Sequence, residues 1–241
     1  MFYQPGLTSH GLPFDPFKSC VIPRPIGWIS TVNEFGQHNL APYSQFQNVT
    51  FDPPIVMFSA NQDTTGNQKD SARNAERTGE FVWNMATYDL RDAVNITAEE
   101  LPNGVDEFER AGLEKLASKL VKPMRVKGSP IQFECVYLNT LRFAGTPPMG
   151  SADVVFGKVV AVHIDDAVID SRGMIDVLKI KPLARMGYFD YTFVDNKFEM
   201  VIPGANKGLL AGLEGSADKS SKELQISRAA HPDRKLGKSS I

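Results

Sequence analysis

Cysteine is scarce in this chain of 241 residues: there are two, Cys20 and Cys135, and they lack the close spacing of metal-binding or redox-active pairs. Two distant cysteines cannot build the disulfide framework of a small secreted domain, so we expect buried, reduced thiols in a cytoplasmic protein. Histidine is also sparse, with four residues, and none combines with Cys, Asp or Glu at the spacing of zinc ligands. The sequence therefore predicts no bound metal.

Long hydrophobic runs are missing as well. No apolar stretch reaches the length needed to cross a bilayer, and residues 1–18 lack the basic and then apolar segments of a signal peptide. Neither sign of charge is in excess: 26 basic and 28 acidic residues give a net charge of −2. This balance offers no electrostatic reason to expect nucleic acid or an anionic membrane as a partner. These absences predict a soluble, cytoplasmic protein.

Three common catalytic and nucleotide-binding motifs are absent. The chain contains no G-x-S-x-G nucleophile elbow, no G-x-G-x-x-G dinucleotide fingerprint and no G-x-x-x-x-G-K-[ST] phosphate loop. The sequence therefore argues against an α/β-hydrolase, a Rossmann dehydrogenase and a P-loop NTPase.

A β-hairpin near the N-terminus is the clearest element that is present. β-Branched and aromatic residues fill 26–32, and small, aromatic and hydroxyl residues alternate from 39 to 47, after a turn at 33–37. Pro25 and Pro42 cannot donate to a sheet ladder, so each is expected at a strand start, an edge or a bulge. A bulge there exposes main-chain groups and makes a place for a ligand.

The order of the remaining elements argues against alternating β and α units. We expect strands at 55–59, 80–86, 131–143 and 154–164, and helices at 69–78, 88–100 and 106–120. Residues 48–54 are expected to be a connection and 182–194 an irregular, aromatic-rich segment. A set of six or seven strands with two or three inserted helices favours an antiparallel barrel with helices outside it over a doubly wound sheet.

The predicted domain organisation has three parts. Residues 1–23 are expected to be an extended lead-in, held on the surface by Phe14, Phe17 and Val21. Residues 24–203 form the barrel domain. After it, the composition shifts toward Gly, Ser, Ala and Lys, so 204–241 are expected to be a flexible C-terminal tail.

Three stretches are candidate ligand sites. Residues 61–74 join a polar loop to a helix start, where unpaired N–H groups and Lys69 suit a phosphate; a surface loop with an ordinary cap is the alternative. Residues 39–44 offer small side chains against which a flat ligand can lie, or they are simply a bulged strand. Residues 185–191 place Arg185 among aromatic side chains, either for stacking and anion neutralisation or as an aromatic cluster of an interface or of the core.

These stretches occur in the order found in a known family. The matching segments are RPIGWIST (24–31), NLAPYS (39–44), DPPIVMFS (52–59), KDSARNAERTGEFVWN (69–84), the G-x-V-x-x-V-H-I run at 157–164 and PLARMGYFDY (182–191). The sequence therefore resembles the flavin reductase-like family of FMN-binding split-barrel proteins, from about residue 20 to about residue 200. This family includes flavoredoxin-like proteins and the reductase components of two-component monooxygenases.

The resemblance implies a fold and a binding site. The implied fold is mainly β with peripheral helices: a six-stranded antiparallel split β-barrel that forms a homodimer, with FMN in a groove at the dimer interface. The family's motifs map onto these expected FMN-binding residues: Ser30, Thr31, Asn39, Ala41, Pro42, Tyr43, Ser44, Ser59, Lys69, Asp70, Ser71, Arg185 and Tyr188. Ser71 stands where the family's K-D-T segment has threonine, and it keeps the hydroxyl.

The implied activity is NAD(P)H-dependent reduction of the flavin, in which hydride passes from NADH or NADPH to flavin N5. The expected electron acceptor is a monooxygenase or another protein. A non-catalytic FMN electron carrier of the flavoredoxin type, reduced by a protein partner, is the alternative, and a split barrel that has lost flavin is a third interpretation. Hydride transfer requires no side-chain acid or base. His163 is the one candidate catalytic residue, as a proton donor or a guide for the nicotinamide, unless it is a structural residue.

Overall fold

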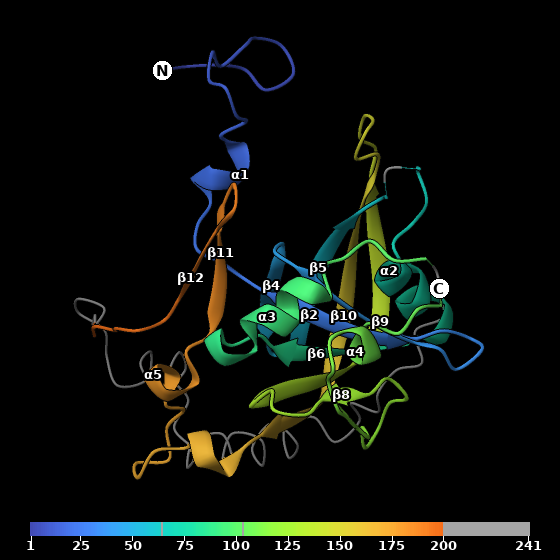
Figure 1. Cartoon of the computed structure of the whole chain (residues 1–241), viewed down its shortest axis with the longest axis vertical. Coiled ribbons are helices and arrows are strands. Elements are labelled where there is room, and N and C mark those ends of the chain that lie inside the picture. The colour runs from blue at the N-terminus through green and yellow to red at the C-terminus, as the bar shows by residue number, and fades with distance from the viewer. Residues whose placement is uncertain (64, 103, 200–241) are drawn as a thin grey trace, which may run out of the picture. The chain divides into compact units, whose positions relative to one another are not determined.

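The computed structural model describes residues 1–63, 65–102 and 104–199, and Met1–Asn196 form one compact unit. The tail expected at 204–241 lies outside the described residues. Within the compact unit, a central sheet is accompanied by short helices (Figure 1). The predicted mainly β class is therefore confirmed.

A seven-stranded sheet forms the centre of the described chain. Its strands, in the order in which they pair, are β3 (His38–Tyr43), β2 (Gly27–Val32), β6 (Glu80–Met85), β9 (Ile131–Phe143), β10 (Ala152–Ile164), β5 (Pro54–Asn61) and β4 (Phe46–Phe51). Each neighbouring pair is antiparallel, as predicted. The described residues place seven strands in this sheet, where six were expected.

Two smaller sheets complete the described β structure. One pairs β1 (Arg24–Pro25), β11 (Leu183–Gly187) and β12 (Asp190–Phe193) in that order, and the other pairs β7 (Lys115–Leu116) with β8 (Arg125–Val126). The expectation that 182–194 is irregular is therefore wrong: this segment contains the β11–β12 hairpin. β1 joins its edge and brings the N-terminal segment beside it.

The hairpin predicted near the N-terminus is confirmed as β2 and β3, which pair along their whole lengths. The Asn33 side-chain oxygen closes the turn by accepting hydrogen bonds from the N–H groups of Phe35 (3.0 Å) and Gln37 (2.9 Å). β3 is an edge strand, so Pro42 removes no hydrogen bond that the sheet needs. Residues 48–54 are not a simple connection, because most of them belong to β4 and the start of β5.

The helices are short, and one of the three predicted helices has the expected length. Residues 69–78 form α2 (Asp70–Thr78). Residues 88–100 form only the 3₁₀ turn η1 (Tyr88–Leu90) and α3 (Arg91–Ile96), and 106–120 form only α4 (Glu107–Arg110). Gly112 stops α4 from continuing, because its φ of 64° is left-handed, and the N–H of Leu113 bonds back to the carbonyl of Phe108 at 2.8 Å.

The remaining helical elements are α1 (Phe17–Cys20), the 3₁₀ turn η2 (Asp166–Val168) and α5 (Val177–Ile180). No helix in the described part of the chain combines the length and the hydrophobicity that crossing a membrane requires.

Hydrophobic side chains pack on both faces of the central sheet, and β2 shows this directly. Trp28 is fully buried in the cluster that contains Val94 and Phe108 of α3 and α4, whereas Ile29 is buried in the cluster that contains α2. Successive residues of a strand point to opposite faces, so all six residues of β2 are buried. The two cysteines are free, but only Cys135 is buried as predicted; Cys20 is exposed.

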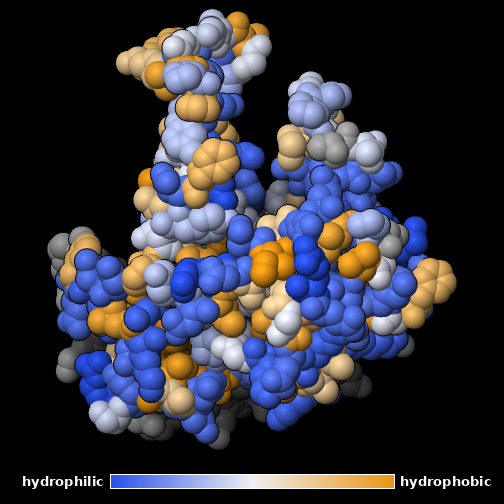
Figure 2. Space-filling model, in the orientation of Figure 1, coloured by the Kyte–Doolittle hydropathy of each residue, from blue (hydrophilic) through white to orange (hydrophobic). Residues whose placement is uncertain are grey.

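The N-terminal segment keeps its apolar side chains in contact with solvent. Phe14, Phe17 and Val21 are 67%, 63% and 65% exposed, so the expectation that they hold this segment on the surface is wrong. Figure 2 shows orange, hydrophobic side chains on the segment at the top of the view.

Candidate functional site

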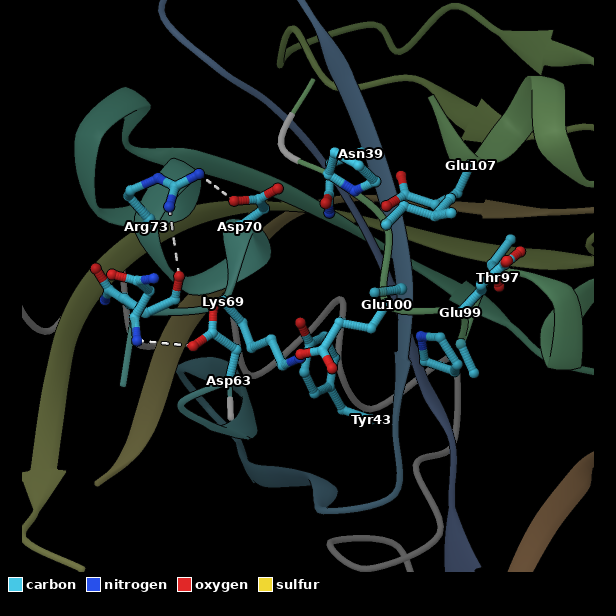
Figure 3. A pocket seen from close by; sticks show the side chains of 17 residues that line it. Asn39, Tyr43, Asp63, Lys69, Asp70, Arg73, Thr97, Glu99, Glu100 and Glu107 are labelled. Carbon is cyan, nitrogen blue, oxygen red and sulfur yellow. Dashed lines mark hydrogen bonds and ion pairs between the residues drawn. The ribbon is translucent and has the colours of Figure 1, made fainter. Parts of the chain in front are cut away.

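A cavity of about 540 Å³, hereafter the main pocket, is bordered by strand β3, the start of helix α2 and residues 97–102 (Figure 3). Its volume lies in the range of small-molecule binding sites. The main pocket is lined by Asn39, Ala41, Pro42, Tyr43, Asp63, Asn67, Gln68, Lys69, Asp70, Arg73, Thr97, Ala98, Glu99, Glu100, Leu101, Pro102 and Glu107.

Helix α2 begins at the main pocket without a side-chain cap. Lys69, the residue before the helix, is extended (φ −60°, ψ 144°), and it makes no side-chain bond to the first turn. The N–H of Arg73 donates to the carbonyl of Lys69 at 3.1 Å. The N–H groups of Asp70, Ser71 and Ala72 come earlier in the first turn, so no carbonyl within the helix accepts a hydrogen bond from them. Such N–H groups and the positive end of the helix dipole attract an anion.

Buried hydrogen bonds fasten this helix to the hairpin. Asn39 Nδ2 donates to Ser71 Oγ at 2.8 Å, and Asn74 Nδ2 donates to Thr31 Oγ1 at 3.1 Å. All four side chains are buried, so losing either bond would leave unsatisfied polar atoms in the interior. These bonds hold the N-terminus of α2 beside β3. Thr31 and Ser71 thus position the walls of the main pocket.

Strand β3 supplies the apolar wall. Ala41 and Pro42 present compact surfaces, and the Tyr43 ring packs against Phe58 with centroids 5.2 Å apart. Burial raises the pKa of Tyr43, against the opposing hydrogen bond to Ser71, so Tyr43 stays a neutral phenol. This wall suits a flat, uncharged ring, whereas the helix start suits an anion.

Charge in the main pocket is unbalanced, because five carboxylates face two cations. The carboxylates belong to Asp63, Asp70, Glu99, Glu100 and Glu107, and the cations to Lys69 and Arg73. Lys69 Nζ lies 2.6 Å from Glu100 Oε1, and Figure 3 shows the two side chains reaching toward each other. Arg73 is paired with Asp70. A ligand anion that contacts Lys69 must therefore compete with Glu100.

Glu107 is a pocket residue that the sequence analysis missed. It begins α4, it is 8% exposed, and its Oε2 accepts a hydrogen bond from the N–H of Leu40 at 2.9 Å. Burial raises the pKa of Glu107 to about 7, and the nearby carboxylates of Asp70 and Asp106 act in the same direction. The Glu107 carboxyl therefore changes its charge near neutral pH. Its sequence signal, one acidic residue at a helix start, is too common to reveal this.

The structure separates the residues that the sequence placed together at FMN. Six of them line the main pocket: Asn39, Ala41, Pro42, Tyr43, Lys69 and Asp70. Ser44, Arg185 and Tyr188 instead line a second cavity, of about 330 Å³. Ser30 and Thr31 are fully buried, and Ser30 Oγ donates to the carbonyl of Met124 at 2.5 Å. Ser59 and Ser71 line neither cavity.

His163 lies beside a buried carboxylate and borders neither of these cavities, but it lines a separate cavity of about 500 Å³ together with Arg125 and Lys127. Its Nε2 is 2.6 Å from Oε1 of Glu134, a fully buried residue of β9. The same carboxylate accepts hydrogen bonds from the N–H groups of Lys119 (2.7 Å), Leu120 (2.6 Å) and Val121 (3.2 Å). This arrangement favours the structural interpretation of His163.

The fold is that of a split-barrel protein, as its likeness to a split-barrel protein from Shewanella frigidimarina NCIMB 400 shows (TM-score 0.64 and 20% identity, over 74% of this chain and 86% of that chain). Among solved structures, nitrilotriacetate monooxygenase component B from Bacillus cereus is similar, with a TM-score of 0.76 and 30% identity over 83% of this chain and 98% of that chain. Flavoredoxin of Desulfovibrio vulgaris (Miyazaki F) has a TM-score of 0.63 and 15% identity, over 83% of this chain and 98% of that chain. At that identity, the likeness to flavoredoxin shows the fold alone.

Sequence comparison identifies the family. The family model described as "Flavin reductase like domain" matches residues 19–191. An uncharacterized protein of Aquifex aeolicus (strain VF5) is 35% identical over 182 residues, which are 75% of this chain and 90% of that protein. The chain belongs to the flavin reductase-like family, as its motifs indicated, and this membership supports a flavin-related oxidoreductase function.

Proposed function

We propose that this protein is an NAD(P)H-dependent FMN oxidoreductase. The main pocket carries the proposal, because it joins an uncapped helix N-terminus and a lysine to a flat apolar wall. These are the surfaces that a phosphate and an isoalloxazine ring require. Family membership and the similarity to a monooxygenase component B support the same assignment.

The residues of the main pocket fit FMN. Lys69 and the first N–H groups of α2 would hold the phosphate, and Asn39 with residues 41–43 would hold the ring. When bound, FMN supplies the redox chemistry, since it accepts a hydride from NADH or NADPH. The protein contributes orientation and electrostatic stabilisation, and we assign no catalytic side chain.

Removing the carboxylate that competes for Lys69 is expected to tighten FMN binding. Glu100→Gln should lower the Kd of FMN by about two- to fivefold, the range of a partly exposed ion pair. Fluorescence titration of the purified variant with FMN measures this change. Glu114→Gln is the matched control, because Glu114 pairs with Lys127 at 2.5 Å on a surface outside the main pocket. Equal tightening in both variants would show that Glu100 does not compete with the phosphate.

Ionisation of Glu107 is expected to make FMN binding depend on pH. The pKa of Glu107 is raised to about 7, so the fraction of ionised carboxyl grows as the pH rises through that value. The added negative charge in the main pocket should weaken FMN binding by about 0.5–1 kcal/mol between about pH 6 and about pH 8. The Glu107→Gln variant keeps an acceptor for Leu40 and should lose this change. Identical pH profiles of Kd in the two proteins would contradict the prediction.

We also propose that the protein is a homodimer. Apolar side chains along β9 and β10 remain exposed in the single chain: Val136, Leu138, Leu141, Phe143, Val160, Val162 and Ile164. Together with the exposed aromatic residues of the N-terminal segment, they offer surface for a second copy. Sedimentation velocity should show a dimer at micromolar concentration, whereas a monomer would overturn this part of the proposal.

The proposed electron acceptor is a monooxygenase or another electron-accepting protein in the cytoplasm. The name of the Bacillus cereus neighbour, a monooxygenase component B, supports an oxygenase partner. The two free cysteines are consistent with a reducing compartment.

The proposed function is tested by the visible absorbance of the protein after incubation with FMN and removal of unbound flavin. NADH or NADPH is then added without oxygen. Prompt bleaching of retained flavin supports the reductase. Retained flavin that does not bleach favours a carrier that a protein partner reduces. If no flavin is retained, NAD(P)H oxidation with excess free FMN decides between a diffusing flavin substrate and a site that does not use flavin.

A further inference from the structure

The second cavity concentrates positive charge. It is lined by residues of the N-terminal segment and of the β11 end, and three of them are cations: Lys18, Arg24 and Arg185. The pairing of β1 with β11 places Arg24 directly opposite Arg185. Like charges at directly opposed strand positions are destabilising. A bound anion would relieve this repulsion.

Among the described residues, no carboxylate forms an ion pair with these cations. Asp15 is the one acidic residue that lines the cavity, and its Oδ1 accepts the N–H of Phe17 at 2.9 Å. Burial lowers the pKa of Arg24, and the neighbouring charge of Arg185 lowers it further.

Arg24 and Arg185 are held in place by neutral acceptors. Arg24 donates to the carbonyl of Val21 at 2.9 Å, and Arg185 donates to the hydroxyl of Tyr191 at 2.6 Å while its guanidinium lies 4.5 Å from the centre of that ring. These contacts fix both side chains without cancelling their charge. The cavity is therefore preorganised for an anion.

Two buried polar atoms of the cavity wall lack a hydrogen-bond partner among the described residues: Nε of Arg24 and Oγ of Ser19. The wall closes around Ser19 only because residue 187 is glycine, since a Cβ there would lie 2.3 Å from the Ser19 hydroxyl. The next residue, Tyr188, has a left-handed φ of 46°. It is the first residue of the two-residue turn between β11 and β12, a position where a left-handed φ is usual.

We propose that the second cavity binds a phosphate group of the kind that a nicotinamide dinucleotide carries, held by Arg24 and Arg185. Two guanidinium groups present several N–H donors to phosphate oxygens, and the Ser19 hydroxyl adds another. This inference rests on the proposed function, because it names the site for the electron donor. It also reassigns Arg185 from flavin binding to donor binding.

Consecutive residues at the end of β3 reach the two cavities. Tyr43 lines the main pocket, and the next residue, Ser44, lines the second cavity. Hydride transfer from a donor whose phosphate is held in the second cavity requires the nicotinamide of the same molecule to reach the flavin ring in the main pocket. The Tyr188 ring is 46% exposed and lies 6.0 Å from the Phe14 ring, so the cavity rim also offers aromatic faces to a purine.

Calorimetric titration of the full-length, flavin-free protein tests the site without turnover. Inorganic pyrophosphate, NAD⁺ and NADP⁺ are the probes. We expect Arg24→Gln and Arg185→Gln each to weaken pyrophosphate binding by about tenfold or more. Lys18→Gln, a change at an exposed side chain, should weaken it by about threefold. Arg172→Gln is the matched control, since it removes an exposed guanidinium that is paired with Asp170 outside both cavities.

The outcomes separate the proposal from its rivals. The proposal is supported if the cavity variants lose affinity for pyrophosphate while their affinity for FMN stays within about twofold of the wild type. If the variants lose affinity equally for NAD⁺ and NADP⁺, the arginines contact the pyrophosphate bridge. If they lose affinity for NADP⁺ alone, the arginines contact the 2′-phosphate. Wild-type protein that does not bind pyrophosphate, or variants that bind it unchanged, would overturn the proposal. So would a loss of affinity for FMN but not for riboflavin, because the arginines would then hold the flavin phosphate.

Two further measurements keep the result interpretable. Arg24→Lys retains the charge and should recover part of the lost affinity, and thermal unfolding verifies that each variant is folded. A protein that fails to oxidise NAD(P)H with excess FMN would refute the proposed function. The pyrophosphate titration would still decide whether the second cavity binds phosphate.

Discussion

Replacing Glu134 by leucine is expected to lower the free energy of unfolding by about 3–5 kcal/mol, the cost of breaking a buried charged network. The Glu134 carboxylate is fully buried and accepts four hydrogen bonds, three from the N–H groups of residues 119–121 and one from His163. Leucine fills a similar volume but accepts none of them. The loop at 119–121 would lose its attachment to β9.

Urea denaturation of the wild type and of Glu134→Leu measures this difference in the free energy of unfolding. Glu114→Leu is the control, because the Glu114 side chain is 73% exposed and its replacement should change stability by less than about 0.5 kcal/mol. Glu134→Gln should fall between the wild type and Glu134→Leu, since an amide oxygen still accepts part of the network. If Glu134→Leu lost no more stability than the control, a structural role for Glu134 and its hydrogen bonds would be refuted.

The stabilisation by Glu134 should disappear in acid. Burial alone would raise the pKa of Glu134, but the hydrogen bonds from Lys119, His163 and Leu120 outweigh it, so the pKa lies below its usual value. A carboxyl with a lowered folded-state pKa stabilises the fold above its unfolded pKa of about 4.3 and loses that effect as the pH falls through the folded value. The stability difference between wild type and Glu134→Leu should therefore shrink below about pH 4.

Replacing Lys69 by methionine is expected to raise the Kd of FMN by about 10- to 150-fold, or about 1.5–3 kcal/mol, if Lys69 contacts the phosphate as proposed. The N–H groups of α2 remain in this variant, so binding should be weakened without being abolished. Riboflavin has no phosphate, and its Kd should change by less than about twofold. Fluorescence titration with both flavins measures the two effects.

Lys127→Met is the matched control for Lys69. Each lysine has one glutamate partner, at 2.6 Å for Lys69 and 2.5 Å for Lys127, but only Lys69 lines the main pocket. In the double variant Lys69→Met with Glu100→Gln, the gain from removing Glu100 should be smaller than in the single variant, because the two changes act on one contact. Unchanged FMN affinity in Lys69→Met would exclude Lys69 from the site.

Local patterns predicted most of the central sheet and one helix. Residues 131–143 and 154–164 are rich in β-branched and aromatic side chains, and they form β9 and most of β10. The same reasoning failed for residues 106–120. Their apolar spacing indicated a helix, but Gly112 ends α4 and residues 115–116 pair with β8 instead. Here tertiary contacts override helix propensity.

The candidate site was predicted only where its residues lie close together in the sequence. Asn39 and residues 41–43 belong to one strand, and Lys69 precedes one helix, so short motifs could indicate them. Glu107 reaches the main pocket because α4 packs against β3, and residues 97–102 reach it because they follow α3, which also contacts β3. No spacing in the sequence encodes these contacts.

The sequence by itself determined the family, the antiparallel class and the start of α2, because each depends on a pattern of a few consecutive residues. Only the tertiary structure decided that Lys69 faces Glu100, that His163 faces Glu134, and that Arg24 and Arg185 share a second cavity. These relations join side chains that are distant in the chain, so they follow from strand pairing and packing, which local sequence patterns do not specify.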